Sequence, residues 1–355
     1  MFRKPDWYEE WAKANPIRSS GPLVLLCTVG VAIIVAVGII LMANPWQTST
    51  LQTGPRGLAL GVIKIDANRT EDPTIAGYSS SEPIIPTGGE VLARDAYENA
   101  EESLGHLTKD NYDRLVTAMR SWTGIEDLFA GEENYQTVVA RMMIQMTQNI
   151  NEGYEEHVGG AGVNCYTCHR GQPVPSGIWF NNVPVNSNVS GWAAAQNRAT
   201  MNSEYTSLPS DALEKYLNDY NVIRVHDLES RVDNEGTATI QDTERTYSLM
   251  NHFSNSLNVN CTFCHNTRAF YDLEQSAPQL NQAQLAIGMI QEINLDYLTQ
   301  IEDVLPPHRL GPMHGDVPKV ACLTCHKGYS KPLNGLDMVS DWPELTTTDD
   351  EVVYE

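Results

Sequence analysis

The hydrophobic pattern of the chain begins with one long uncharged run at residues 22–43. As a helix rising about 1.5 Å per residue, this run spans about 33 Å, which is enough to cross the hydrocarbon core of a bilayer. Basic residues precede it and the next one is Arg56, so the positive-inside rule predicts a cytoplasmic N-terminus at residues 1–21. A cleaved signal peptide is the alternative, although the run is longer than a usual signal core. We therefore expect a single-pass transmembrane helix.

Amphipathic helices dominate the rest of the pattern. Apolar side chains recur at intervals of three and four residues in several segments, as they do on one face of a helix. Gly- and Pro-rich stretches separate these segments, so we expect a mainly α fold with long loops. The predicted helices cover residues 108–120, 135–150, 249–257 and 282–298.

The charge of the chain restricts its partners. The 355 residues include 45 acidic and 23 basic side chains, which gives a formal net charge of −22. Binding of nucleic acid requires clustered Lys and Arg, so this balance excludes a nucleic-acid partner. The seven cysteines are too few for a disulfide scaffold, and their spacing is therefore more informative than their number.

Six of the seven cysteines form three identical C-x-x-C-H motifs. Two cysteines three residues apart and the histidine after them share one face of a helical turn. In c-type haem attachment the two thiols form thioethers with the porphyrin, and the imidazole binds the iron. Each motif therefore predicts one covalently bound haem c, three in all. The predicted donors and iron ligands are Cys165, Cys168 and His169, then Cys261, Cys264 and His265, and then Cys322, Cys325 and His326.

Other uses of these cysteines fit the pattern less well. A zinc site needs four ligands and usually two C-x-x-C pairs, and a redox C-x-x-C does not require a histidine after each pair. Cys27 remains as a membrane-buried thiol, which leaves no cysteine for a disulfide. The first motif continues from its histidine as His-Arg-Gly and the third as His-Lys-Gly. This likeness predicts a duplicated haem-binding unit.

The pattern leaves the sixth ligand of each iron open. A methionine, a histidine or water can fill this position. Spacing does not choose among Met142, Met143 and Met146 upstream of the first motif, whereas Met250 is the one methionine in the helix before the second. The candidates for the third site are His157, Met289, His308, Met313 and His314.

These motifs and their surroundings resemble a known family. The strings VVARMMIQMTQNIN, VNCYTCHRGQPVP, VNCTFCHN and CLTCHKGYSKPLNG are similar to those of the cytochrome c subunit bound to photosynthetic reaction centres of purple-type bacteria. The resemblance implies two pseudo-symmetric lobes that carry a row of c-type haems. It also implies that Met143 is the axial ligand opposite His169 and Met250 the one opposite His265. His157 would then pair with His326 at a bis-histidine haem.

One departure from the family is large. Family members commonly have four haem motifs, and the first should follow residues 108–120, but residues 121–133, which come next here, contain no cysteine or histidine. The chain is therefore predicted to be a three-haem variant in which Met119 is a packing residue. The expected organisation is an irregular arm at residues 44–85, lobe 1 at 86–209 with one haem and the relic site, lobe 2 at 210–345 with two haems, and a solvated acidic tail at 346–355.

The resemblance implies an electron carrier rather than an enzyme, with no catalytic residues. Electrons would pass from a soluble periplasmic cytochrome c or high-potential iron–sulphur protein, through the haems, to the photooxidised bacteriochlorophyll pair of the reaction centre subunits. The haem-bearing part would be periplasmic and anchored in the bacterial inner membrane. A membrane-anchored multihaem quinol dehydrogenase, or another respiratory multihaem cytochrome, is the alternative, because it would share the anchor and the motifs.

Overall fold

The computed structural model describes most of the chain. It covers residues 4–43, 48–52, 61–65, 72–97, 100, 104–130, 133–182, 196, 200–204, 206–225, 238–270, 272–348 and 352–354. The chain divides into two units, the first formed by residues 1–51 and 63–70, the second by residues 52–62 and 71–355.

The first unit contains the apolar run. Helix α1 spans Asp6–Ala14 and helix α2 spans Pro16–Ala43. Within α2, Val24–Met42 is the one stretch among the described residues that is long and apolar enough to cross a membrane. The predicted membrane helix at residues 22–43 therefore lies inside α2, which begins earlier and ends at the expected residue.

The predicted arm at residues 44–85 is less irregular than its composition suggests. Strands β1 (Thr48–Gln52) and β2 (Gly61–Ile65) form a two-stranded sheet, and a 3-10 helix follows at Pro73–Gly77. Residues 44–47, 53–60 and 66–71 of this arm lie outside the described residues.

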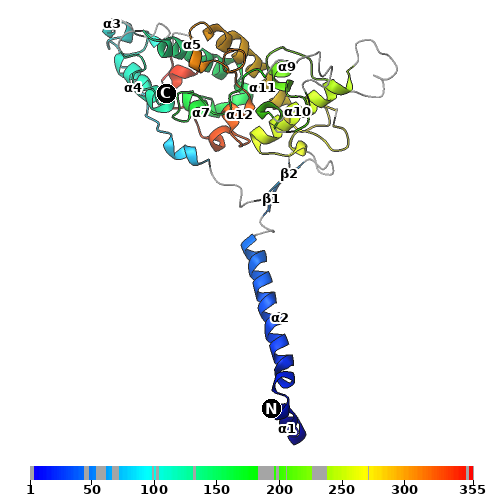
Figure 1. The fold of residues 1–355 in the computed structure, drawn as a ribbon. Helices are drawn as coiled ribbons and strands as arrows, with labels where there is room; N and C mark the ends of the chain where they lie inside the picture. The colour runs from blue at the N-terminus through cyan, green and yellow to red at the C-terminus, as the bar shows by residue number, and fades with distance from the viewer. Residues whose placement is uncertain are drawn as a thin grey trace. The chain divides into compact units, whose positions relative to one another are not determined.

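The second unit is mainly helical, as predicted (Figure 1). Capping residues explain where the longer helices begin and end. Thr108 caps the N-terminus of α4, and Gly124, with a left-handed backbone, ends it; Asn134 caps α5 and Thr239 caps α10. The α-helices are α3 (Ala93–Ala96), α4 (Lys109–Thr123), α5 (Tyr135–Gly153), α6 (Glu155–Val158), α7 (Cys165–His169), α9 (Ala212–Leu217), α10 (Ile240–Leu257), α11 (Gln279–Glu292) and α12 (Cys322–His326). A π-helix at Ile293–Leu298 extends α11. The predicted helix at residues 282–298 is therefore continuous, with α-helical hydrogen bonding in its first part and π-helical hydrogen bonding from Ile293 on.

Two groups of three helices repeat the same arrangement. In the first group α4 lies against α7, with α5 between them in sequence, and in the second α10 lies against α12, with α11 between them. The Gly171 amide donates to the Trp122 carbonyl at 2.8 Å, and the Gly328 amide donates to the Ser256 carbonyl at 2.8 Å. Each bond joins the end of the first helix to the glycine after the motif helix, so the two groups are pseudo-symmetric.

The core consists of two clusters of buried side chains. The first gathers α4 and the C-terminal residues Leu333, Met338, Trp342 and Leu345. The second gathers α9, α10, α11 and the segment before α12, together with Ile150 of α5. The C-terminal segment, which the sequence placed in lobe 2, thus packs in the core of the first group. The lobe boundary at residues 209 and 210 stays a prediction.

A buried ion pair fixes this C-terminal segment to α4. The Arg114 guanidinium lies 2.5 Å from the Glu344 carboxylate, and the two side chains are only 6% and 0% exposed. The guanidinium also lies over the Trp342 ring, 4.2 Å from its centroid. Beyond this segment Val352 packs on the first cluster, so the tail is partly packed where the sequence predicted a solvated end. The acidic residues Asp349, Asp350, Glu351 and Glu355 lie outside the described residues.

Candidate haem sites

The first and third motifs adopt the same local structure. Each forms a short helix of five residues, α7 or α12. The first cysteine begins this helix, and the second cysteine and the histidine end it. The hydroxyl of Thr167 accepts from the Asn164 amide, and that of Thr324 accepts from the Ala321 amide, both at 3.0 Å. Arg170 and Lys327 then end these helices with left-handed φ of 52° and 50°, and a glycine follows each. The duplicated unit predicted from the flanking residues is therefore visible in the structure.

One asparagine side chain holds the segment before each of these two motifs. The Asn151 side chain bonds both the amide and the carbonyl of Val163, at 2.8 and 2.9 Å. The Asn294 side chain bonds both groups of Val320, at 2.8 and 3.1 Å. Each valine lies two residues before the first cysteine of its motif. The sequence analysis missed this pair, although the repeated Ile-Asn at residues 150–151 and 293–294 is a signal that could have found it.

Asn294→Ala is expected to lower the free energy of unfolding by about 1–3 kcal/mol, because the Val320 amide and the Leu217 carbonyl lose their hydrogen bonds to the Asn294 side chain. Thermal unfolding of the purified full-length protein measures this. Asn281→Ala, at an exposed position in α11, is the matched control and should change stability by less than about 0.5 kcal/mol. Equal losses in the two variants would contradict the role given to Asn294.

All three motif histidines use the same ring nitrogen for a hydrogen bond to backbone. His169 Nδ1 donates to the Gln172 carbonyl at 2.8 Å, and His326 Nδ1 donates to the Tyr329 carbonyl at 2.9 Å. His265 Nδ1 donates to the Phe270 carbonyl at 2.8 Å. A carbonyl only accepts, so the proton is on Nδ1 and the Nε2 lone pair of each ring is available to a metal.

The second motif differs from the other two. Residues Cys261–Phe263 form a 3-10 helix rather than an α-turn, and the Phe270 ring stacks on His265 with ring centroids 5.3 Å apart. Cys261 and Phe270 are both exposed. The second site is therefore more open to its surroundings than the sites on α7 and α12.

The rings of His157 and His326 lie next to each other, with an interplanar angle of 63°. Their ring centroids lie 6.2 Å apart. Two imidazoles that bind one metal ion from opposite sides, with metal–nitrogen bonds of about 2.0–2.1 Å, have ring centres about 6 Å apart. His157 Nδ1 donates to the Gln282 carbonyl at 3.1 Å, which leaves its Nε2 free as well. Burial lowers the pKa of His157, and it lowers that of His326 to about 4, so both rings are neutral at physiological pH, as metal binding requires.

The methionines near the first and second motifs lie at the second core cluster. Met142, Met143, Met146 and Met250 are half-buried there, and this shared burial does not distinguish Met143 from its neighbours. The repeat does not distinguish them either. Counting back eight residues from Asn151 reaches Met143, and the same count from Asn294 reaches Ala286. Counting back five residues instead reaches Met146 and Met289.

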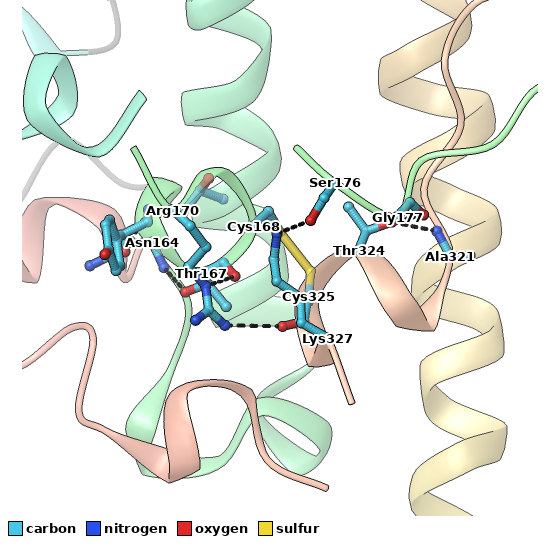
Figure 2. The surroundings of a disulfide bond; sticks show 12 residues. Asn164, Thr167, Cys168, Arg170, Ser176, Gly177, Ala321, Thr324, Cys325 and Lys327 are labelled. Carbon is cyan, nitrogen blue, oxygen red and sulfur yellow. Dashed lines mark hydrogen bonds between the residues drawn. A yellow bond between two sulfur atoms is a disulfide. The ribbon is translucent and has the colours of Figure 1, made fainter. Parts of the chain in front are cut away.

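One pairing departs from the sequence analysis, which left no cysteine for a disulfide. Cys168 and Cys325 are joined by a disulfide, with Cα atoms 4.6 Å apart (Figure 2). They occupy equivalent positions on α7 and α12, which pack together, so their thiols meet at the junction of the two groups. A sulfur in this bond cannot also form a thioether, so haem attachment requires these two sulfurs to be separate, and the six thioether donors stay a prediction.

Aromatic side chains pack around the end of α4, where the family resemblance would place a further motif. Turns follow α4, without a further helix before residue 131. The Trp122 ring lies 4.7 Å from that of Trp342 and 6.1 Å from that of Tyr78. Met119 is 1% exposed in the same cluster, which agrees with its predicted role as a packing residue.

The chemistry of the donors fits haem better than a bare metal ion. Burial raises the pKa of the Cys165 and Cys322 thiols to about 12, and that of Cys264 to about 11. A zinc site would need four ligands, usually from two C-x-x-C pairs. Among the described residues, no group of three or more His, Cys, Asp or Glu side chains is placed to hold a metal ion.

Comparisons with known proteins agree with this donor set. The family model described as photosynthetic reaction centre cytochrome C subunit matches residues 43–346. A photosynthetic reaction center cytochrome c subunit of Roseobacter denitrificans is 52% identical and covers 99% of this chain and 100% of its own length. Those of Rubrivivax gelatinosus and Thermochromatium tepidum are 37% and 34% identical, and cover 83% and 90% of this chain and 82% and 81% of their own lengths.

These matches confirm the family resemblance, and they favour electron transfer over the quinol dehydrogenase considered from the sequence. The mainly helical fold with one apolar N-terminal helix is consistent with them. The chain belongs to the photosynthetic reaction centre cytochrome c subunit family and serves electron transfer in a membrane-associated reaction centre.

Proposed function

We propose that this subunit carries electrons through three covalently attached haem c groups to the photooxidised bacteriochlorophyll pair. When bound, haem supplies one-electron chemistry at its iron. The observation that carries this proposal is the set of three motif histidines, each with Nδ1 bonded to a carbonyl and Nε2 free. No catalytic residue is assigned, because relay requires fixed ligands rather than a substrate pocket.

The axial ligand pairs are His169 with Met143, His265 with Met250, and His326 with His157. The short distance between the His157 and His326 rings supports the third pair. If Met143 is the ligand at the first site, its equivalent before the third motif is Ala286, which cannot bind iron. Two methionine-ligated sites and one bis-histidine site give an uneven series of reduction potentials, since methionine raises the potential of haem iron.

Attachment of haem at the first and third motifs requires Cys168 and Cys325 as free thiols, because a sulfur in a disulfide cannot also form a thioether. The proposal therefore applies to the chain in which these two sulfurs are not bonded to each other. Cys165 and Cys168 would then hold one porphyrin, and Cys322 and Cys325 another.

The arrangement in the membrane follows from the charge around α2. Residues 22–43 cross the bacterial inner membrane once, the N-terminus is cytoplasmic, and the haem-bearing unit is periplasmic. A soluble periplasmic cytochrome c or high-potential iron–sulphur protein donates the electrons. The net charge of −22 suits a donor with a basic face, because complementary charge accelerates encounter.

Flash excitation of native membranes tests this function. We expect haem absorbance to bleach after a single flash as an electron leaves for the oxidised pigment pair, and to recover when the soluble donor is added. Membranes from a strain that lacks this chain are the control. Unchanged haem absorbance in membranes whose pigment pair is oxidised by the flash would rule the function out.

A further inference from the structure

The Arg170 guanidinium lies buried at the junction of the first and third motifs. Its Nε donates to the Thr167 carbonyl at 3.0 Å, on its own helix α7, and its Nη2 reaches the Cys325 carbonyl on α12 at 3.4 Å (Figure 2). The side chain is 4% exposed. A full positive charge is therefore held out of water between two haem motifs.

A carboxylate from the arm neutralises this charge. Asp72 Oδ2 lies 2.5 Å from Arg170 Nη1, and the Asp72 side chain is also 4% exposed. The other carboxylate oxygen, Oδ1, accepts from the amide and the hydroxyl of Thr74, at 2.9 and 2.5 Å. Burial alone would raise the pKa of Asp72, but the hydrogen bonds from Thr74 and Arg170 outweigh it and lower the pKa. The carboxyl group therefore stays ionised beside the guanidinium.

The third motif has a cation at the matching position but a different partner. Lys327 ends α12 as Arg170 ends α7, and its Nζ donates to the Ser176 hydroxyl at 2.8 Å (Figure 2). The lysine thus has a neutral hydroxyl where the arginine has a carboxylate. The repeat is symmetric in its backbone and asymmetric in its charge.

We propose that Asp72 is a positioning residue that sets the reduction potentials at the first and third motifs by neutralising Arg170. The proposal rests on the proposed attachment of haem at these motifs. Reduction adds one negative charge, so a nearby buried cation favours the reduced state and a buried carboxylate opposes it. Arg170 directly follows His169 and bonds the backbone of Cys325, so its charge acts on both sites. The second motif has no described bond to this pair.

Asp72→Asn tests this proposal, because it removes the charge and keeps the shape and an acceptor oxygen. We expect the reduction potentials of the haems at the first and third motifs to rise. The equilibrium constant for one-electron reduction should increase about tenfold, which corresponds to 59 mV. The second motif should be unaffected. Arg170→Gln should shift the same potentials downward, and the double variant should return them toward wild type. Redox titration of haem absorbance in the purified full-length protein measures all of these.

Two further variants serve as controls. Asp72→Glu keeps the charge and should keep wild-type potentials. Asp219→Asn removes a carboxylate from the ion pair with Lys215, whose side chains are 33% and 35% exposed, and should shift no potential, because solvent screens that pair. Haem content, measured in every variant, separates loss of attachment from a change of potential.

Opposite shifts in Asp72→Asn and Arg170→Gln are the result that a merely structural anchor would not give. Shifts in the same direction, or unchanged potentials in Asp72→Asn with three haems attached, would overturn the proposal. Loss of haem in all of the Asp72 and Arg170 variants, including Asp72→Glu, would also overturn it and leave an anchoring role. The flash experiment on the wild-type protein tests the proposed function separately, and neither result decides the other.

Discussion

His157→Met is expected to raise the reduction potential of the haem proposed on Cys322 and Cys325. In the proposed ligand set the change replaces bis-histidine ligation with histidine and methionine, which favours the reduced iron. The shift should be on the order of a tenth to a quarter of the roughly 0.8 V that axial ligands span. Redox titration of the purified protein resolves this component, and low-temperature electron paramagnetic resonance reports the change of ligand.

A surface histidine supplies the matched control for this experiment. His308 is exposed in the 3-10 helix Pro307–Arg309, and it was one of the candidates that spacing alone left open. His308→Met should leave every potential unchanged. A wild-type potential in His157→Met, or a shift in His308→Met, would show that the sixth ligand of the third site is assigned to the wrong residue.

Trp122→Ala is expected to lower the free energy of unfolding by about 3–5 kcal/mol, as is usual when a buried tryptophan is truncated. The side chain is 0% exposed and contacts the rings of Tyr78 and Trp342. These rings fill the part of the core next to α4, so their loss leaves a cavity there. Thermal unfolding of the full-length protein, followed by near-UV circular dichroism, measures the loss.

Haem content should be unchanged in Trp122→Ala, because the residue belongs to the core and not to a motif. Tyr247→Ala is the control, since this tyrosine is 57% exposed on α10, and it should change stability by less than about 0.5 kcal/mol. A Trp122→Ala protein as stable as Tyr247→Ala would mean that the aromatic cluster does not stabilise this lobe.

The sequence predicted the elements whose signal is local. The apolar run, the four amphipathic helices and the three motifs each depend on residues close together in the chain, and the periodicity of side chains is sufficient for them. Contacts between segments far apart in the chain have no such local signal, and only the family resemblance suggested them. His157 lies next to His326 across 169 positions of sequence, and spacing alone ranked it no higher than His308 or His314.

The remaining features depend on contacts that have no periodic signature. The bonds from Asn151 and Asn294 to valines of the motif segments, and the Asp72–Arg170 pair, each join one polar side chain to a distant partner. The packing of the C-terminal segment on α4 is of the same kind. Nothing in the composition of Leu333, Met338 or Trp342 indicates which of two similar cores receives them.

The C-terminal packing has a consequence for the order in which the chain matures. The first core cluster combines α4 with Leu333, Met338, Trp342 and Leu345, so it cannot close until this distant segment is in place. Contacts of such long sequence separation form late, because loop closure must precede them. Tyr166 of the Cys165 motif belongs to the same cluster, so the surroundings of this motif are completed late in folding.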